Sequence, residues 1–279
     1  MRDKTIHSPL EICKNYFPKK NRIKAIIFDF DGTISTFRHG WELVMEPLMR
    51  EMIGGGFDDS DELKQMIREY IDSSTGVQTI FQMQWLAARV QEFGLNPKPK
   101  DGWWYKDEYN HRLMKQISGR IQSVQNGEVR CENYIMTGAK TFLEELKERG
   151  FRLYLASGTD HDDVCREATI LGVFELFELV MGAPERKAAC PKEAVIRQIM
   201  NDQQLEGSEM AIVGDGKVEI ALAATIGAYA LGIASNEDTR QGINSVKRQR
   251  LISAGAHAIA GDFACKDKLI ALFTGHSAV

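Results

Sequence analysis

The feature that most constrains this sequence is a set of three short apolar runs, each of which stops abruptly at a cluster of small polar residues. The runs are KAIIFDFDGT from Lys24, FRLYLASGT from Phe151 and EMAIVGDG from Glu209. Continuous apolar segments of this length, bounded by turn residues, are typical of strands that are buried on both faces of a parallel sheet. We therefore predict three buried parallel strands at these positions.

Helical patterns alternate with the predicted strands. TGAKTFLEELKERG has apolar residues at helical spacing and ends at Gly150, and two further helical patterns, HDDVCREATILG and PKEAVIRQIM, follow the second strand. After Asp215 the alternation continues with VEIALAATIG, YALGIA, a helical stretch from Ser245 and AHAIAGDF. This rhythm predicts an α/β fold with a doubly wound, Rossmann-like parallel sheet of at least five strands.

The interval from residue 37 to residue 133 breaks this rhythm. It contains WELVMEPLMREMI, DELKQMIREYI, IFQMQWLAARVQEFG and EYNHRLMKQISGRIQSV, which have helical spacing of apolar residues and few β-branched runs. We predict an all-helical domain over residues 37–133. It would be inserted into an α/β core domain formed by residues 1–36 and 134–279.

Composition argues against several classes of partner. The net charge of −4 provides no basic surface of the kind that binds nucleic acid. The most apolar stretch, 220–234, is interrupted by glycines, so we expect no membrane-spanning segment, and the first twenty residues lack the apolar run of a secretion signal. Five scattered cysteines without a CxxC pair argue against a disulfide framework or a zinc cage. We expect a cytoplasmic monomer or small homo-oligomer.

Four polar residues follow directly on the predicted strands: Asp29, Asp31, Ser157 and Asp215. Ligands of open parallel sheets bind beyond the carboxyl ends of the strands, so we expect these residues to converge on one crevice. Asp29 and Asp31 flank Phe30, and an extended backbone would place both carboxylates on the same side. Two neighbouring carboxylates need a counter-ion or a proton. Mg²⁺, which prefers oxygen ligands, would suit Asp29 together with Asp215.

These strand ends resemble the motifs of a known superfamily. IIFDFDGTI resembles the first motif of the haloacid dehalogenase superfamily, LYLASGT its second and IVGDG its fourth, in the expected order from Ile23 to Asp262. FLEELKERGFRLYLASGTD and GDGKVEIALAATIGAYALGIAS resemble the phosphoglycolate-phosphatase-like branch. The resemblance implies a magnesium-dependent phosphatase that acts on a small phosphorylated metabolite, either a sugar phosphate or a phosphoglycolate-like compound. It also identifies the helical insertion as a C1 cap, whose closure would exclude water.

The resemblance assigns chemical roles to the first and fourth motifs. Asp29 would be the nucleophile that forms an aspartyl-phosphate, and Asp31 would act as general acid and then general base. Asp29, the backbone carbonyl of Asp31 and Asp215 would hold Mg²⁺. Gly216 and Glu219 would support the site. Glu219 would anchor the active-site lysine or a metal-bound water, and a direct metal contact from Glu219 stays open.

The resemblance also implies a phosphate-binding group. Ser157 would donate its hydroxyl to a phosphate oxygen, assisted by backbone N–H groups near Gly158 and Thr159. A lysine of the third motif would offset charge on the phosphoryl oxygens. Lys187 and Lys192 are the candidates. We predict Lys192, because it opens the helical pattern PKEAVIRQIM where the family places this residue.

Substrate specificity is expected to reside in the cap. Arg38, just after the first motif, and Gln78 and Gln82, polar positions in apolar helical sequence, are the predicted substrate contacts. These residue types can bind anionic groups and hydroxyls. They do not identify a substrate.

Two other functions remain open from the sequence. A sugar phosphomutase of the β-phosphoglucomutase type has the same pair of aspartates and the same cap, and it differs by keeping phosphate on a sugar product. A non-catalytic phosphometabolite-binding protein is the alternative from another class. The complete set of Asp29, Asp31, Ser157, Lys192 and Asp215 argues against it.

Overall fold

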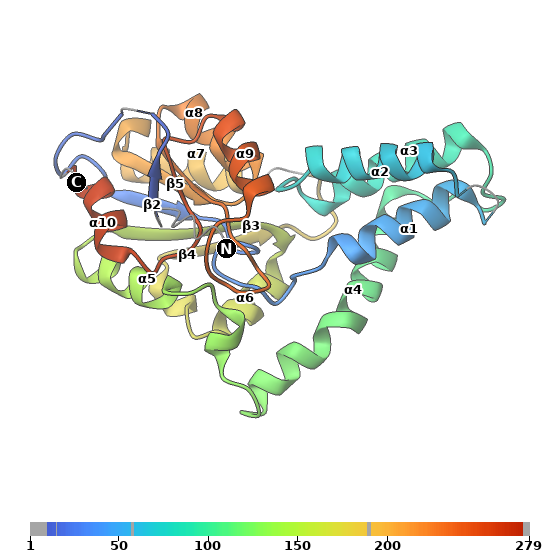
Figure 1. Cartoon of the computed structure of the whole chain (residues 1–279), viewed down its shortest axis with the longest axis horizontal. Helices are drawn as coiled ribbons and strands as arrows, with labels where there is room; N and C mark the ends of the chain where they lie inside the picture. Colours follow the sequence, from blue (N-terminus) through green and yellow to red (C-terminus); the bar gives the residue numbers. More distant parts are fainter. Residues whose placement is uncertain (1–9, 15, 57–58, 189–190, 276–279) are drawn as a thin grey trace, which may run out of the picture.

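The fold is built around a seven-stranded sheet (Figure 1). The structure, a computed structural model, describes residues 10–14, 16–56, 59–188 and 191–275. Within these residues the strand order is β1-β7-β6-β5-β2-β3-β4. Strands β2 to β7 are parallel, and β1 pairs antiparallel with β7. The predicted doubly wound α/β core is therefore confirmed. The strands are β1 Leu10–Ile12, β2 Ala25–Phe28, β3 Arg152–Asp160, β4 Leu179–Ala183, β5 Met210–Gly214, β6 Tyr229–Ile233 and β7 Ala258–Ala260.

The chain changes direction across the sheet at β2. Strands β3 and β4 extend the sheet on one side of β2, whereas β5, β6 and β7 extend it on the other side. Phe28, the last residue of β2, pairs with Leu155 of β3 and Val213 of β5, so these three strands lead to the same edge of the sheet. A reversal of strand order leaves a crevice beyond the carboxyl ends of the strands, and ligands of this fold class bind there.

Alternating side chains of β2 cover the two faces of the sheet. Ala25 and Ile27 belong to an apolar cluster with residues of α7 (Pro191–Gln203), α8 (Lys217–Ile226) and α9 (Ser245–Ala254). Ile26 and Phe28 belong to a second cluster with residues of α5 (Ala139–Glu148), α6 (His161–Ile170) and α10 (Lys266–Thr274). Figure 1 shows these two groups of helices on opposite sides of the sheet. Burial on both faces explains why the strands are continuously apolar.

Four of the helices between β2 and β3 lie to one side of the sheet (Figure 1). They are α1 Glu42–Gly54, α2 Asp61–Ser73, α3 Thr79–Phe93 and α4 Gly102–Gln125, at the positions of the four predicted helical patterns. In α2 the buried side chains Leu63, Ile67 and Ile71 recur every four residues, which places them on one face. Among the helices that the structure describes, none has the length and apolarity needed to cross a bilayer.

Strands β1 and β4 were not predicted. β1 is only three residues long, and β4 reads LVMGA, with Gly182 in a segment for which the sequence analysis assigned no structure. Three short 3₁₀ helices complete the described elements: η1 Cys131–Tyr134, η2 Phe174–Leu176 and η3 Gly207–Glu209. The four described cysteines, Cys13, Cys131, Cys165 and Cys265, are free thiols. Cys190 and residues 1–9 lie outside the described residues.

Candidate active site

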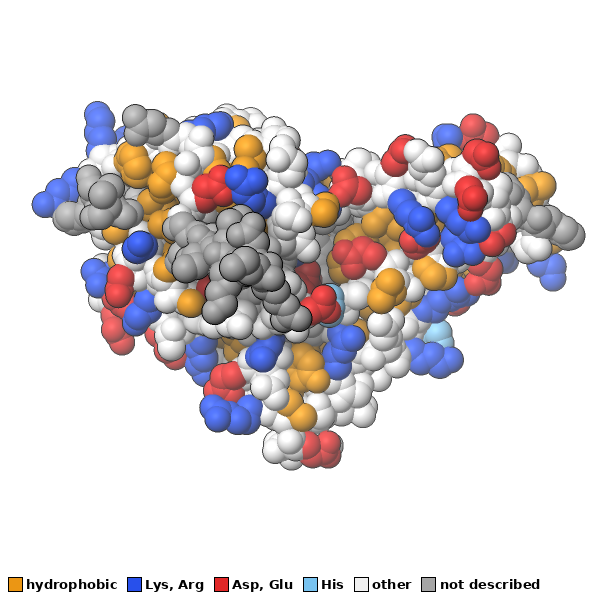
Figure 2. Space-filling view, in the orientation of Figure 1, with side chains coloured by type: hydrophobic (Ala, Val, Ile, Leu, Met, Phe, Trp, Pro, Cys, Tyr) orange, Lys and Arg blue, Asp and Glu red, His pale blue; other side chains and the backbone are white. Residues whose placement is uncertain are grey.

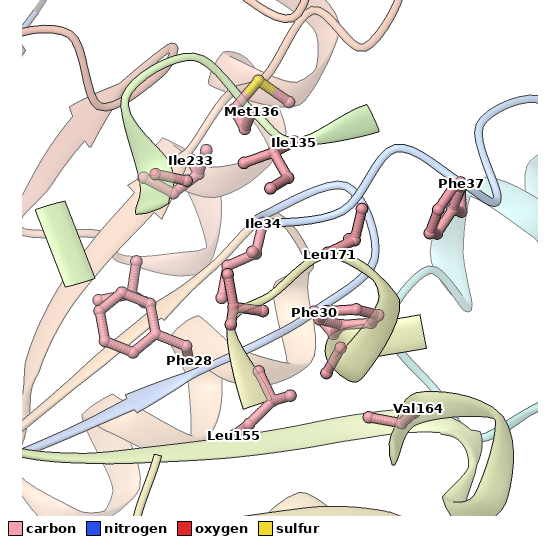
Figure 3. Packing of buried hydrophobic residues seen from close by; sticks show 14 of the residues in the cluster. Phe28, Phe30, Ile34, Phe37, Ile135, Met136, Leu155, Val164, Leu171 and Ile233 are labelled. Carbon is pink, nitrogen blue, oxygen red and sulfur yellow. The ribbon is translucent and has the colours of Figure 1, made fainter. Parts of the chain in front are cut away.

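The loop after β2 is fixed by Phe30, whose side chain is fully buried. Figure 3 shows Phe30, two residues after the end of β2, packed in an apolar cluster with Ile34, Leu171 and Val164. Burial of a side chain of this size stabilises the loop by about 2 kcal/mol. Because Phe30 occupies the core, its neighbours Asp29 and Asp31 are left to line the adjacent cavity.

A cavity of about 230 Å³ lies between the strand ends and the helical segment. The sheet side contributes the predicted residues Asp29, Asp31, Ser157, Lys192 and Asp215. The helical side contributes Trp41, Thr75, Gly76, Gln82 and Tyr109. Figure 2 shows the surface hollowed between these two parts, with acidic and apolar side chains on the walls. The structure therefore brings the strand-end residues together, as convergence at a switch point requires.

Asp29 is paired with Lys192 inside the site. The Lys192 ammonium lies 2.9 Å from Oδ1 of Asp29 and also pairs with the buried carboxylate of Glu219. Burial raises the pKa of Asp29, and the charge of Lys192 opposes that rise. Lys187, the alternative lysine, is exposed and is absent from the described residues that line the cavity. Of the two candidate lysines, Lys192 is therefore the one that reaches Asp29.

Asp31 is held by hydroxyl groups at the end of β3. Thr159 donates a hydrogen bond of 2.7 Å to its Oδ2, and Ser157 lies 3.4 Å from the same oxygen. Burial raises the pKa of Asp31 to about 6, and the nearby Arg38 guanidinium counteracts that rise. Its other oxygen, Oδ1, is buried and has no hydrogen-bond partner among the described residues. A carboxyl with this pKa exchanges protons near neutral pH, as a general acid and base must.

The last residues of β3 present further polar groups to the cavity, in the part of the strand where its pairing with β4 is irregular. Ser157 is buried, and its Oγ accepts a hydrogen bond of 3.1 Å from the backbone N–H of Thr159. Gly158 lines the cavity between them. A Cβ on Gly158 would lie 3.5 Å from the backbone of Gln78, so the helical segment closely approaches this end of β3. Hydroxyls and backbone N–H groups at such an irregular strand end can bind the oxygens of an anion.

Asp215 is bound to a lysine that the sequence analysis did not identify. Lys247 lies 2.6 Å from Oδ2 of Asp215. Burial raises the pKa of Asp215, whereas the Lys247 charge lowers it and Asp29 raises it further. Gly32 packs against the same carboxylate with a φ of +72°, and a Cβ there would lie 2.3 Å from Oδ2. Only glycine fits between the first-motif turn and Asp215.

The donor atoms suit a hard divalent cation. Asp29 and Asp215 are buried carboxylates, and Asp31 follows Asp29 in the loop after β2, so the available ligands, including the Asp31 backbone carbonyl, are all oxygens. The described residues include no group of three or more His, Cys, Asp or Glu side chains arranged around a metal position. Mg²⁺ is commonly held by one or two carboxylates together with phosphate and water. The two aspartates and the carbonyl therefore fit Mg²⁺.

Arg38 is committed to acidic partners. Its guanidinium donates hydrogen bonds of 2.6 Å to Glu167 and 3.0 Å to Asp163, both on α6. Its Nε lies 3.9 Å from Oδ1 of Asp31. Arg38 lines the cavity as predicted, and its Nε and Nη2 donors are directed to these carboxylates. In this arrangement Arg38 fixes the surroundings of Asp31.

The two predicted glutamines have different positions. Gln82 lines the cavity and donates a hydrogen bond of 3.0 Å to the hydroxyl of Ser74. Gln78 is buried and donates to the backbone carbonyl of Lys187 across 3.1 Å. Gln78 is not among the described residues that line the cavity. It connects the helical segment to the loop before α7.

Sequence reasoning missed Ser235, Glu237 and Lys247. Ser235 and Glu237 follow β6 closely, so the strand-end rule that found Asp215 would have found them too. Lys247 gave no such signal, because it lies inside the helical pattern that starts at Ser245.

The whole-sequence comparison agrees with this geometry. Residues 23–227 match the haloacid dehalogenase-like hydrolase family. The chain belongs to this family. It is 24% identical over 219 residues to a phosphoglycolate phosphatase of Vibrio vulnificus (strain CMCP6), covering 77% of this chain and 85% of the relative. It is 23% identical over 211 residues to a phosphoglycolate phosphatase of Vibrio cholerae serotype O1, covering 76% and 84%. The resemblance of the motifs is thus confirmed, and the chain is an enzyme of the hydrolase class.

Two solved structures of the family share the fold. A predicted phosphoglycolate phosphatase from Haemophilus somnus 129PT matches with a TM-score of 0.61 and 18% identity, covering 89% of this chain and 98% of the other. A β-phosphoglucomutase from Clostridium difficile matches with a TM-score of 0.54 and 16% identity, covering 83% and 97%. At these identities the matches show a common fold that serves both kinds of enzyme.

Proposed function

We propose that this protein is a magnesium-dependent phosphatase that hydrolyses a small phosphorylated metabolite through an aspartyl-phosphate on Asp29. One observation carries the proposal: the Lys192-bound carboxylate of Asp29 and the carboxyl of Asp31, with its pKa raised to about 6, line the same cavity. The Asp29 carboxylate can attack phosphorus, and the Asp31 carboxyl can give and take a proton.

The first half-reaction transfers the phosphoryl group to Asp29. A carboxylate oxygen of Asp29 forms a bond to phosphorus while the bond from phosphorus to the ester oxygen breaks. Asp31 gives its proton to the departing oxygen, so the product leaves as an alcohol. Lys192, which touches both Asp29 and Glu219, offsets negative charge at the nucleophile.

The second half-reaction releases phosphate. Asp31, now ionised, takes a proton from a water molecule whose oxygen attacks phosphorus, and the bond between phosphorus and Asp29 breaks. Inorganic phosphate leaves and both aspartates return to their starting states. The Thr159 hydroxyl, at 2.7 Å from Oδ2, holds Asp31 in place for both transfers.

The remaining groups bind the phosphoryl oxygens. The Ser157 hydroxyl and the backbone N–H groups near Gly158 and Thr159 are the donors on one side of the cavity. Asp29, Asp215 and the carbonyl of Asp31 would hold Mg²⁺ on the other side. When bound, this ion supplies positive charge that offsets the charge of the phosphoryl oxygens.

We propose that residues 37–133 form a cap domain over a core of residues 1–36 and 134–279. Ion pairs join the two parts on both flanks of the cavity: Asp72 of α2 pairs with Lys217 and Arg250. On the other flank, Lys106 and Asn110 of α4 both donate to Asp160, at the end of β3. A cap held in this way excludes water from the reacting groups and limits the substrate to a small molecule.

The deciding experiment is phosphate release from a panel of sugar phosphates and phosphoglycolate, with Mg²⁺ and then with a chelator. We expect release from at least one compound with Mg²⁺ and no release after chelation, and Asp29→Asn protein serves as the blank. The names of the Vibrio relatives make phosphoglycolate the first compound to test. Phosphate that moves between positions of a sugar without release would indicate a phosphomutase. Binding without any conversion would indicate a non-catalytic phosphometabolite-binding protein.

A further inference from the structure

The ammonium group of Lys247 is surrounded by hydrogen-bond acceptors at the edge of the site. It lies in the first turn of α9, where the Asn244 side chain accepts hydrogen bonds from the backbone N–H groups of Val246 and Lys247. Its side chain lines the cavity and is only 13% exposed. The first turn of α9 therefore fixes the backbone of Lys247, and the Lys247 ammonium reaches the residues at the carboxyl ends of the strands.

All three N–H groups of the Lys247 ammonium have an acceptor. Its Nζ lies 2.6 Å from Asp215, 2.6 Å from Glu237 and 3.0 Å from the hydroxyl oxygen of Ser235. The single hydroxyl hydrogen of Ser235 goes to the carbonyl of Gly32, so this oxygen is an acceptor for Lys247. In this state Lys247 has no donor left over for a substrate.

Asp215 therefore has two competing partners, Lys247 and the proposed divalent cation. Its Oδ2 pairs with Lys247, and the proposed function assigns the same carboxylate to a divalent cation. A doubly charged ion at Asp215 would stand close to the ammonium in a buried site, where like charges repel strongly. Glu237, which is 11% exposed, gives Lys247 a second carboxylate to which it can remain bound when Asp215 turns to the ion.

We propose that Lys247 competes with the divalent cation for Asp215 and thereby weakens metal binding, with Glu237 as its second anchor. Lys247 is in this sense a positioning residue that acts through Asp215. The inference rests on the proposed function, because that function assigns Asp215 to magnesium. If Lys247 only oriented the Asp215 carboxylate, removing Lys247 would weaken metal binding. If Lys247 competes with the cation, removing it strengthens metal binding.

The test is a calorimetric titration of chelator-stripped, full-length protein with MgCl₂, in the absence of substrate. We expect Lys247→Met to bind Mg²⁺ at least about tenfold more tightly than the parent. Lys247→Gln, which keeps an N–H donor for Glu237 but removes the charge, should show the same direction and covers the case in which the methionine variant does not fold. Lys24→Met is the matched control. It removes a lysine paired with Glu209 at the opposite, amino end of the strands and should leave the affinity unchanged.

Thermal unfolding provides a second readout that needs no turnover. Without metal, Lys247→Met should unfold at a lower temperature than the parent, because Asp215 and Glu237 lose their shared partner. Added Mg²⁺ should then raise the unfolding temperature of this variant more than that of the parent. Equal or weaker Mg²⁺ binding by both Lys247 variants, beside normal binding by the parent, would overturn the role of Lys247 alone. If neither the parent nor any of the variants binds Mg²⁺, both the proposed magnesium dependence and this inference are overturned.

Discussion

Gly76 of the helical segment lies directly against Glu219 of α8. A Cβ on Gly76 would be 3.2 Å from each carboxylate oxygen of Glu219, and the φ of Gly76 is +88°. One of these oxygens, Oε2, is buried without a hydrogen-bond partner among the described residues. The loop between α2 and α3 therefore covers the pair formed by Lys192 and Glu219, and it can do so only because residue 76 has no side chain.

A side chain at position 76 should loosen this cover. We expect Gly76→Ala to reduce kcat/KM by about tenfold or more, because the added methyl group presses on the carboxylate that anchors Lys192. Gly94→Ala is the matched control, since Gly94 has a φ of +65° and nothing within 4 Å of an added Cβ. Both variants should lose stability in thermal unfolding through backbone strain, of about 1 kcal/mol. Equal losses of activity in the two variants would refute the covering role.

Asp29→Asn should abolish turnover and leave the fold intact. The amide is nearly isosteric with the carboxylate but cannot act as the nucleophile, so the rate should fall by about a thousandfold or more. Phosphate release measures turnover, thermal unfolding measures whether the fold is intact, and intact-protein mass after acid quench detects the phosphoenzyme. An aspartyl-phosphate adduct in the parent should be missing from the variant, and a variant that still turns over would contradict the mechanism.

Asp31→Asn should separate the two half-reactions. With an alkyl phosphate the rate should fall by about a hundredfold or more, because the leaving oxygen receives no proton. With p-nitrophenyl phosphate the leaving group needs no proton, so a burst of nitrophenol should precede a slow phase limited by hydrolysis of the phosphoenzyme. Rapid-mixing absorbance records the burst. A variant that slows both substrates alike, with no burst, would argue against the proton-transfer role.

His39 should make stability depend on pH. Its ring faces Glu237 and Asp238, and the hydrogen bond to Glu237 raises the pKa of His39 above its ordinary value of 6.5. The folded state thus holds the proton more tightly than the unfolded state. The contribution of His39 is complete below pH 6.5 and is lost as the pH rises through the raised pKa.

The matching measurement is the urea midpoint of the parent and of His39→Gln between about pH 5.5 and about pH 8. The parent should lose part of its advantage over the variant as the pH rises. The His39 side chain is 37% exposed, so the change should be small. A constant difference between the two proteins across this range would show that the ring is not charged in the pair.

The strand ends were predictable because each obeys a local rule. Asp29, Ser157 and Asp215 follow apolar runs. The topology of a parallel sheet brings them together independently of how the helical segment packs. The choice of Lys192 over Lys187 needed the family's pattern, since nothing in the composition of that segment separates the two lysines. Four helices between β2 and β3 were equally readable from their periodicity.

The partners of these residues were less predictable. Arg38 lines the cavity as expected, but the sequence did not predict that its guanidinium would bind Glu167, which lies 129 residues later in the chain. Gln78 was expected beside the substrate and instead holds the backbone of Lys187. Such pairings depend on how the helical segment docks on the sheet, and a single sequence carries no periodic signal for that contact.

The short strand β1 gives the core a protected flank. Leu10, Glu11 and Ile12 pair with Ala260, Ile259 and Ala258, so the outer hydrogen-bonding groups of β7 are covered by a segment from the beginning of the chain. β1 is now the outer strand on this side of the sheet, and a very short edge strand is one of the ways in which natural sheets limit pairing with other molecules. Three residues that contribute nothing to the chemistry of the cavity thus replace β7 as the edge and limit edge-to-edge aggregation.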